Sequence, residues 1–165
     1  MIVYLVGMPG SGKSTVGREL AGRYGVPFVD IDEEVEREAG ASVSEIFARE
    51  GESAFRAMEA QALLKASTHD PSVVACGGGI VLEPANRIAL RNTGICVFLD
   101  VPLALLHERV RPAADRPLVR HEGDLDRLFV EREPLYREFA GHVVDASGDP
   151  GEVADAIVEE LRWSA

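Results

Sequence analysis

The N-terminal stretch restricts what this chain can fold into more than any other part of it. A short apolar run, residues 1–6, leads directly into GMPGSGKST at residues 7–15, which matches G-x-x-x-x-G-K-[ST] at every fixed position. The residues that follow, up to Ala21, carry apolar side chains at helical spacing. A strand, a glycine-rich loop and a helix in this order predict a P-loop, which binds the phosphates of a nucleoside triphosphate.

The residue types in this loop suit a polyphosphate ligand. Gly7, Gly10 and Gly12 allow backbone conformations that a Cβ atom would forbid, so the loop can approach phosphate closely. Its N–H groups and the positive end of the following helix then face the anion. The lysine neutralises the β- and γ-phosphates, and the Ser14 hydroxyl is placed to ligate Mg²⁺. We expect the phosphates to be bound by Gly10, Ser11, Gly12, Lys13, Ser14 and Thr15.

Length and composition are those of an ordinary globular protein. The chain has 165 residues, 46% hydrophobic and 27% charged, which favours a single domain over residues 1–165. No stretch approaches the roughly 20 apolar residues of a membrane span, and the first apolar run is too short for a signal peptide. Cys76 and Cys96 lie in apolar runs and are expected to be buried thiols. We expect a cytoplasmic protein.

The net charge of −11 restricts the possible partners. Repulsion between like charges argues against nucleic acid and anionic membranes as ligands. A nucleoside triphosphate is itself an anion, so lysine and arginine side chains must converge at one site while acidic side chains cover the rest of the surface.

Strand and helix patterns alternate along the chain. Apolar, β-branched runs predict strands at residues 1–6, 26–32, 72–76, 95–99 and 142–145. Helical spacing predicts helices at about residues 15–21, 33–38, 42–67, 83–91, 100–111, 123–140 and 151–163. A capping box of Ser42 and Glu45 should begin the helix that bends at Gly51, and Asp100 should cap the helix after the fourth strand. Five strands separated by helices imply a mostly parallel sheet with helices on both faces.

In such a sheet, ligands bind beyond the carboxyl ends of the strands. Gly7, Asp30, Asp32, the glycines at 77–79 and Asp100 fall at these ends. Asp30 and Asp32 point the same way if both belong to the strand, whereas a loop after the strand could direct one to a metal ion and the other to an acceptor. A carboxylate suits the orientation of a hydroxyl that attacks a γ-phosphate. The alternative is that Asp32 caps a helix and Asp30 is a solvated turn residue.

Arg56 lies beside an apolar helical stripe of Phe55, Met58 and Ala62. One interpretation is a surface arginine paired with Glu59. The other is a fork for a substrate carboxylate, with Glu59 holding the guanidinium in place.

Three glycines follow the third strand, Gly77, Gly78 and Gly79. A plain turn is a poor use of such a run, because each glycine loses much backbone entropy on folding. Bare backbone at the carboxyl edge of a sheet admits a small ligand closely, and we expect these glycines to contact one.

Two further arginines are candidates for the site. Arg116 lies between Pro112 and Pro117 in a stretch without periodicity, where a mobile lid could carry it onto a transferring phosphoryl group. Arg132 lies in a charged helical stretch, VEREPLY at residues 130–136. The alternative for both is a solvated surface charge.

Taken in order, these motifs resemble those of shikimate kinase. The P-loop alone indicates only a nucleoside triphosphate, whereas the later motifs in this order are far more specific. Pro9 is more typical of other small-molecule kinases, and Cys76 stands where a hydroxyl residue is often expected. The resemblance covers nearly the whole chain and rests on GxxxxGKST at 7–15, FVDID at 28–32, FRxxE at 55–59, GGG at 77–79, RPL at 116–118 and ERxPLY at 131–136.

The resemblance implies transfer of the γ-phosphoryl group of ATP to the 3-hydroxyl of shikimate, a step of aromatic amino acid (chorismate) biosynthesis, with Mg²⁺ as cofactor. It also implies the α/β three-layer fold of the P-loop nucleoside monophosphate kinases, with a five-stranded parallel sheet in the order 2-3-1-4-5. Substrate-binding helices would lie at about residues 33–60 and a mobile lid at about 112–121. We expect ATP and shikimate as ligands, no nucleic acid or membrane partner, and a monomer.

The resemblance also assigns roles on the shikimate side. Asp32 would bind the shikimate hydroxyls and act as the base. Arg56 and Arg132 would clamp the carboxylate, and the backbone of residues 77–79 would contact the ring.

On the nucleotide side, Asp30 would hold Mg²⁺ together with Ser14, directly or through water. Lys13 and Arg116 would stabilise charge during the transfer. Adenine would be flanked by Arg109 and Pro150.

Two other functions fit parts of the sequence. A gluconate- or nucleotide-type kinase shares the P-loop, but its acceptor gives no reason for Arg56, Arg132 and three glycines to converge. A nucleotide-hydrolysing switch that uses GTP would carry an N-K-x-D motif, and the sequence contains none.

Overall fold

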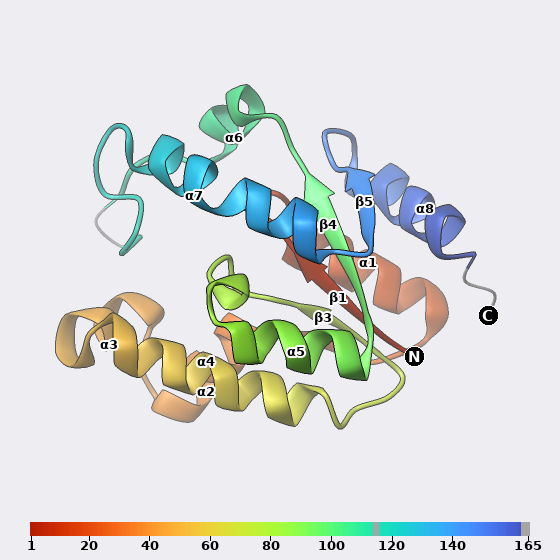
Figure 1. The fold of residues 1–165 in the computed structure, drawn as a ribbon, viewed down its shortest axis with the longest axis horizontal. Helices are drawn as coiled ribbons and strands as arrows, with labels where there is room; N and C mark the ends of the chain where they lie inside the picture. The colour runs from red at the N-terminus through yellow and green to blue at the C-terminus, as the bar shows by residue number, and fades with distance from the viewer. Residues whose placement is uncertain (114–115, 163–165) are drawn as a thin grey trace.

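The computed structural model of the chain describes residues 1–113 and 116–162. Its strands form one parallel sheet in the order β2-β3-β1-β4-β5 (Figure 1), which confirms the predicted order. The strands of this sheet are β1 (Ile2–Val6), β2 (Phe28–Asp30), β3 (Ser72–Ala75), β4 (Ile95–Asp100) and β5 (His142–Asp145).

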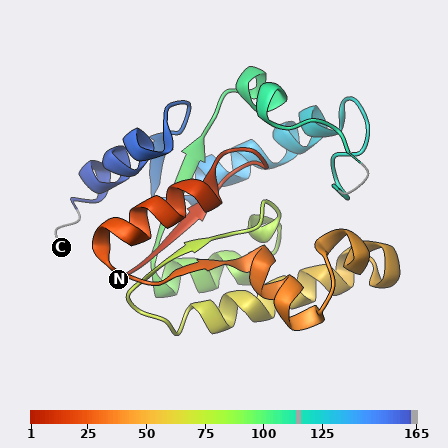
Figure 2. The same ribbon diagram turned by 180° about the vertical axis from the view of Figure 1, so that it is seen from behind.

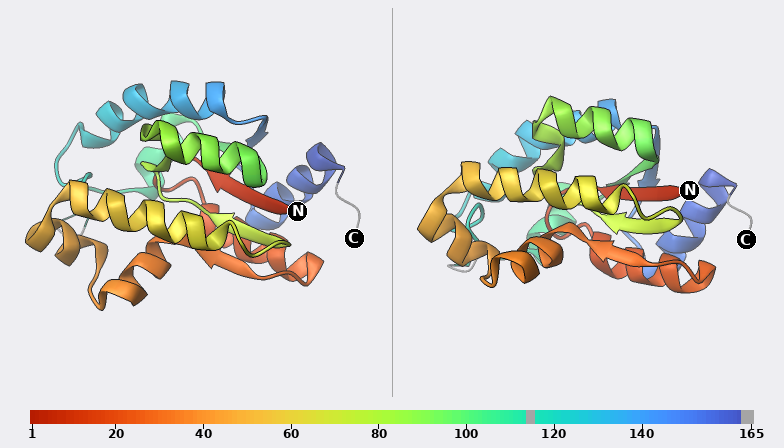
Figure 3. Two further views of the ribbon diagram at one scale, coloured as in Figure 1. Left: turned by 60° about the horizontal axis from the view of Figure 1, so that its bottom comes forward. Right: turned by 90° about the horizontal axis from the view of Figure 1, so that it is seen from below.

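Helices cover both faces of the sheet. On one face α1 lies beside α8 (Figure 2), and on the other α5 and α7 pack against the 3-10 helix η1 (Figure 1). Helices α2, α3 and α4 pack on one another, and α3 extends beyond the carboxyl end of the sheet (Figure 3). Within the described ranges, no helix is long and apolar enough to cross a bilayer. The helices are α1 (Lys13–Tyr24), α2 (Ile31–Ala39), α3 (Val43–Glu50), α4 (Glu52–Ala66), η1 (Ile80–Leu82), α5 (Pro84–Thr93), α6 (Leu103–Arg109), α7 (Asp124–Phe139) and α8 (Pro150–Leu161).

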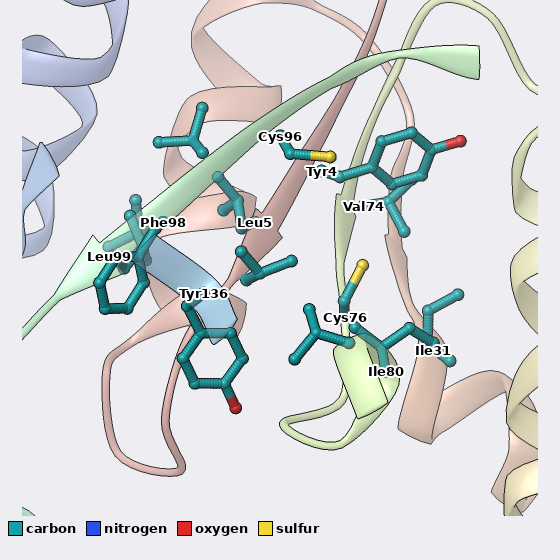
Figure 4. Close-up of a cluster of buried hydrophobic side chains, with 14 of the residues drawn as sticks. Tyr4, Leu5, Ile31, Val74, Cys76, Ile80, Cys96, Phe98, Leu99 and Tyr136 are labelled. Atoms are coloured by element: carbon teal, nitrogen blue, oxygen red, sulfur yellow. The ribbon is translucent and has the colours of Figure 1, made fainter. Parts of the chain in front are cut away.

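Strand β1 lies in the middle of the sheet, and none of its residues is more than 1% exposed. A central parallel strand covered on both faces has no solvated side, so its sequence is continuously apolar instead of alternating. Figure 4 shows Tyr4 and Leu5 of β1 among buried side chains of the neighbouring strands. Cys76 and Cys96 are both buried and unpaired, as predicted.

Helix α2 begins earlier than the sequence predicts. Strand β2 ends at Asp30, whose carboxylate caps α2 by accepting hydrogen bonds from the N–H groups of Asp32 and Glu33. The predicted strand through Asp32 is therefore wrong, and so is the alternative that Asp32 is the cap. An acidic cap followed by acidic residues in the first turn favours a helix start here, because both interact well with the helix dipole.

The expected cap at Asp100 is also wrong. Asp100 is the last residue of β4, and its carboxylate accepts a hydrogen bond from Arg137 at 2.7 Å. Helix α6 begins only after Pro102 and ends at Arg109, two residues before the predicted end.

Glycine interrupts the long helix predicted at residues 42–67. Gly51 has a φ of 87°, so the segment forms two helices, α3 and α4, instead of one bent helix. The predicted capping box of Ser42 and Glu45 is present. At the other end of the chain, α8 begins at Pro150, and its predicted end at Trp163 lies outside the described residues.

Two glycines of α1 make a matched test of packing. A Cβ atom at Gly17 would lie 2.5 Å from the Phe28 ring, whereas one at Gly22 would have no atom within 4 Å. We expect Gly17→Ala to lower the free energy of unfolding by about 1–3 kcal/mol through overpacking. Gly22→Ala should raise it by about 0.5–1 kcal/mol through helix propensity. Urea denaturation of both variants measures this, and equal effects would contradict the packing of α1 on β2.

Candidate active site

Three cavities that share lining residues open at the carboxyl edge of the sheet, and the first of them is lined by most of the candidate residues. The second cavity, of about 420 Å³, is lined by Lys13, and Asp32 lines both the second cavity and the first. A third, of about 270 Å³, lies between the P-loop and the loop before α8 and is lined by Arg109 and Pro150. The first cavity, of about 380 Å³, brings together Asp32, Arg56, Gly77, Gly78, Gly79, Arg109, Arg116 and Arg132.

The P-loop presents free donors to the second cavity. Gly12, in the left-handed region with a φ of 88°, precedes α1, and no side chain caps this helix. Its first N–H groups are therefore available to an anion. Gly10 also has a positive φ, of 80°, and a Cβ atom there would lie 2.3 Å from Val110. Only glycine fits at this point, where the loop packs against the end of α6.

Lys13 is held by the loop it belongs to. Its Nζ atom donates to the carbonyl oxygens of Gly7 and Met8 at 2.8 and 2.9 Å. Burial lowers the pKa of Lys13 to about 8, although the nearby Asp32 opposes the shift. A polyphosphate would supply an opposite charge for this partly buried ammonium group.

Ser14 and Asp30 are suited to hold a small divalent cation. The Ser14 hydroxyl donates to Asp30 Oδ2 at 2.5 Å, and the other carboxylate oxygen caps α2. In the part of the chain that the structure describes, no group of three or more His, Cys, Asp or Glu residues could hold a metal ion. Mg²⁺ usually binds through one or two protein oxygens, with water and substrate phosphates as its other ligands. Ser14 and Asp30 supply two such oxygens next to each other.

Asp32 projects from the first turn of α2 into the space shared by the first two cavities. Its Oδ1 atom is buried and has no hydrogen-bond partner among residues 1–113 and 116–162. Burial, and then the neighbouring Asp30, raise the pKa of this carboxyl group, while Lys13 acts against the shift. An unpaired buried carboxylate oxygen next to a cavity suits a ligand hydroxyl as its donor.

Arg56 is oriented by two carboxylates of its own helix. It donates to Glu59 Oε2 at 3.2 Å and to Glu52 Oε1 at 3.0 Å. Glu59 is fully buried, so the interpretation of a plain surface pair is wrong. Burial raises the pKa of Glu59 to about 7 against the opposing effect of Arg56. The remaining oxygen, Oε1, has no partner in the described ranges.

Arg132 is buried on α7, with only 3% of its surface exposed, which rules out a solvated helix charge. Its Nε atom lacks a hydrogen-bond partner within the described part of the chain. A buried guanidinium that lines a cavity alongside Arg56 favours an anionic ligand between the two arginines.

The other two arginines both line the first cavity, and only Arg109 also lines the third. Arg116 is exposed at the rim of the first cavity. Arg109 lines the first and third, and it donates to the carbonyl oxygens of Gly10, Ala146 and Ser147 at 3.2–3.4 Å.

The apolar wall of the first cavity was not predicted from the sequence. Val43 and Phe47 of α3 line it together with Phe55 of α4, and the two phenylalanine rings lie 5.0 Å apart. Val43 and Phe47 are four residues apart on a short helix, which is the signal that could have indicated a shared face. A cavity lined by both arginines and apolar side chains suits a small ring that carries a carboxylate.

Comparisons with known proteins agree on one family. A family model described as shikimate kinase matches residues 9–162. The shikimate kinase of Aromatoleum aromaticum is 49% identical over 167 aligned positions, which cover 98% of this chain and 95% of that protein. The solved structure of a shikimate kinase from Acinetobacter baumannii in complex with shikimate has a TM-score of 0.93 and 37% identity, covering 98% of this chain and 92% of that one.

The chain belongs to the shikimate kinase family. It is therefore a phosphotransferase with an alcohol acceptor, and its activity is the ATP-dependent phosphorylation of shikimate in aromatic amino acid biosynthesis. A gluconokinase from Sinorhizobium meliloti matches with a TM-score of 0.58 at 19% identity, covering 97% of this chain and 90% of that one. That likeness shows the fold alone, so the gluconate-type alternative is not favoured.

Glu59 should make the stability of the ligand-free protein pH-dependent. Its folded pKa of about 7 lies above the ordinary 4.5. Between these values the folded state binds more protons than the unfolded state, so stability falls as pH rises. The contribution is complete below pH 4.5 and lost above pH 7, and it amounts to about 3 kcal/mol. Glu59→Gln removes this titration. In urea denaturation, the free energy of unfolding of the variant minus that of the wild type should therefore increase by about 3 kcal/mol between pH 4.5 and pH 7.

Glu52→Gln is the matched control for this experiment. Glu52 bonds the same guanidinium but is about half exposed. Its substitution should leave the pH profile parallel to that of the wild type. A parallel profile for Glu59→Gln as well would contradict the assignment of the titration to the buried carboxyl group.

Proposed function

We propose that phosphoryl transfer takes place where the first two cavities meet, with ATP held by the P-loop and shikimate held between the arginines. The observation that carries this proposal is that the cavity of Lys13 and the cavity of Arg56 and Arg132 share Asp32. A carboxylate at the boundary faces both the phosphate side and the acceptor side, which is the position that in-line transfer requires.

The phosphates of ATP would be bound by the loop N–H groups and Lys13, and the adenine by the third cavity between Arg109 and Pro150. Support comes from the uncapped N-terminus of α1 and from the lining of that cavity. The residues proposed for the phosphates are Gly10, Ser11, Gly12, Lys13, Ser14 and Thr15.

Ser14 and Asp30 would hold Mg²⁺, because their oxygens already lie within hydrogen-bond distance of each other at the phosphate side. When bound, the ion neutralises the charge that develops on the phosphate oxygens. Asp30 is fixed by its role as the cap of α2 through Oδ1, so its other oxygen, Oδ2, is held facing the Ser14 hydroxyl.

Shikimate would place its carboxylate between Arg56 and Arg132 and its ring against the backbone of residues 77–79. Bidentate arginine–carboxylate contacts give orientation as well as affinity. Asp32 would then accept a hydrogen bond from a hydroxyl of the ring, through the oxygen that is unpaired in the free protein.

In the reaction, the 3-hydroxyl oxygen forms a bond to the γ-phosphorus as the bond to the β–γ bridging oxygen breaks, and ADP leaves. Asp32 orients the hydroxyl and receives its proton, a role for which the raised pKa suits it. Lys13 and Arg116 stabilise the charge that moves onto the phosphate oxygens, and positioning with electrostatics supplies most of the acceleration.

The remaining parts of the proposal concern the chain as a whole. Residues 1–165 act as one domain, with substrate-binding helices at about 33–60. Residues 112–121 act as a lid that carries Arg116 onto ATP; of these, 114–115 lie outside the described residues. The protein works as a cytoplasmic monomer, without nucleic acid or membrane partners.

A coupled assay of ADP release tests this function. ADP release should require shikimate, should be absent with gluconate, and should stop when EDTA removes divalent cations and resume with excess Mg²⁺. Release without an acceptor, or equal release with gluconate, would overturn the assignment of the acceptor. Unchanged activity in EDTA would overturn the proposed metal site.

Arg132→Ala should separate the two substrates. Removing a buried charge-assisted partner of the carboxylate should raise the shikimate KM at least about 30-fold, equivalent to about 2 kcal/mol, and leave the ATP KM within about twofold. Arg127→Ala is the control on the same helix, since the side chain of Arg127 is 76% exposed. An unchanged shikimate KM in Arg132→Ala would remove Arg132 from the site.

A further inference from the structure

Tyr136 is a fully buried residue of α7 to which the proposed mechanism gives no role. Its ring stacks on Phe98 with the centroids 5.4 Å apart, and the two side chains lie side by side in Figure 4. Its hydroxyl donates a hydrogen bond to the carbonyl oxygen of Gly78. Tyr136 is not among the residues that line the first cavity, so it reaches that cavity through the residues it contacts.

The same hydroxyl lies next to Arg132. Arg132 and Tyr136 are four residues apart on α7 and so share one face of the helix. A hydroxyl can donate one hydrogen bond and accept others, so the oxygen that donates to Gly78 can also accept from Arg132. Burial raises the pKa of Tyr136, and the positive charge of Arg132 acts against this shift. The raised pKa keeps the hydroxyl protonated, so it can donate to Gly78. The position of a Cβ atom on Gly78 would be 3.3 Å from Arg132 Nη1 and 3.5 Å from the tyrosine oxygen.

Among residues 77–79, the carbonyl groups of Gly77 and Gly79 accept hydrogen bonds from N–H groups of η1, and that of Gly78 does not. The Tyr136 hydroxyl donates to this remaining carbonyl group. The carbonyl oxygens of Gly77 and Gly79 accept from the N–H groups of Ile80 and Leu82, both at 3.1 Å. The N–H groups of the three glycines donate to no acceptor in the part of the chain that is described. In a trans peptide the C=O and N–H groups point to opposite sides. Turning the Gly78 carbonyl toward Tyr136 therefore turns the N–H of Gly79 away from it.

A peptide between two glycines has little steric restriction of its own. A hydrogen bond from a rigid, stacked and buried phenol supplies the restriction that side chains would otherwise provide. Arg132 Nη1 and the same oxygen both lie beside the Cβ position of Gly78, so the oxygen is placed to restrict a long side chain that could otherwise adopt many rotamers. One oxygen thus orders two of the groups proposed to bind the acceptor.

We propose that Tyr136 is a positioning residue that holds Arg132 and the Gly78–Gly79 peptide in a single arrangement for an anionic, hydroxylated acceptor. This inference rests on the proposed function, because it concerns the same acceptor cavity. Tyr136 acts through Arg132 and the glycine backbone, and it affects the acceptor and not the nucleotide.

Tyr136→Phe tests the proposal, since it removes one oxygen and keeps the ring. The shikimate KM should rise about three- to tenfold, the range expected for one hydrogen bond. The ATP KM should stay within about twofold of the wild type. If the hydroxyl were merely structural, removing it would lower the melting temperature without this selective change in KM. An unchanged shikimate KM, or equal rises in the KM of both substrates, would therefore overturn the proposal.

Tyr4→Phe is the matched control. Tyr4 is equally buried and its hydroxyl shares a hydrogen bond of 2.7 Å with Thr93, but it lies in β1 and lines no part of the three cavities. Its substitution should leave both KM values unchanged, whatever it does to the melting temperature. A shikimate KM raised as much by Tyr4→Phe as by Tyr136→Phe would overturn the assignment of the effect to Tyr136.

A double-mutant cycle with Arg132→Lys tests the coupling. If Tyr136 acts partly by holding Arg132, the rise in shikimate KM in the double variant should be smaller than the product of the two single rises. A rise equal to the product would overturn the coupling. The wild-type protein distinguishes a failure of this inference from a failure of the proposed function. If the wild type shows no shikimate-dependent ADP release, the proposed function is wrong. If the wild type releases ADP normally and Tyr136→Phe has an unchanged shikimate KM, only the inference about Tyr136 is wrong.

Discussion

The site depends on charged groups that are buried beside the triple-glycine loop. Burying a charge is tolerable only when the charge is paired and hydrogen-bonded. Glu59 is paired with Arg56 through one oxygen, yet Glu59 Oε1, Asp32 Oδ1 and Arg132 Nε have no partner within the described ranges. Unpaired buried polar atoms are destabilising, and a ligand with a carboxylate and hydroxyls can relieve part of that penalty when it binds. The free protein is arranged for its ligand and not for maximal stability.

The fold holds these groups in place with elements that a ligand does not have to order. Asp32, Arg56 and Arg132 each project from a helix, α2, α4 and α7. Strand β1, the buried centre of the sheet, is paired with β3 and β4, which lead into the triple-glycine loop and α6. Side chains on packed helices lose less freedom on binding than side chains on loops, so more of the interaction energy remains for affinity and orientation.

What could be predicted from the sequence depends on the range of the interactions. The P-loop and the capping box of Ser42 are local patterns, and both the loop conformation and the cap are present. The end of β2 was mispredicted, because a Val-Asp-Ile-Asp pattern fits both a strand and a capped helix, and the side chain of Asp30 decides between them. The two interpretations of Arg56 could not be separated from sequence, because the burial of Glu59 arises from packing between distant segments. Convergence at the site likewise follows from sheet order, for which the family resemblance supplied the prediction.

An acidic protein can attract two anions because charges act over different ranges at its surface and inside its cavities. Exposed charges are screened beyond about 8 Å at physiological ionic strength, so most of the net charge of −11 has little effect within the cavities. At the surface, Arg18 and Lys65 already pair with carboxylates, which leaves those cations little attraction for a small anion. Arg132 is shielded from water and carries no carboxylate of its own among the described ion pairs. Its attraction for an anion is therefore both stronger and less screened than that of a paired surface cation, which lets an acidic protein bind anionic substrates in these cavities.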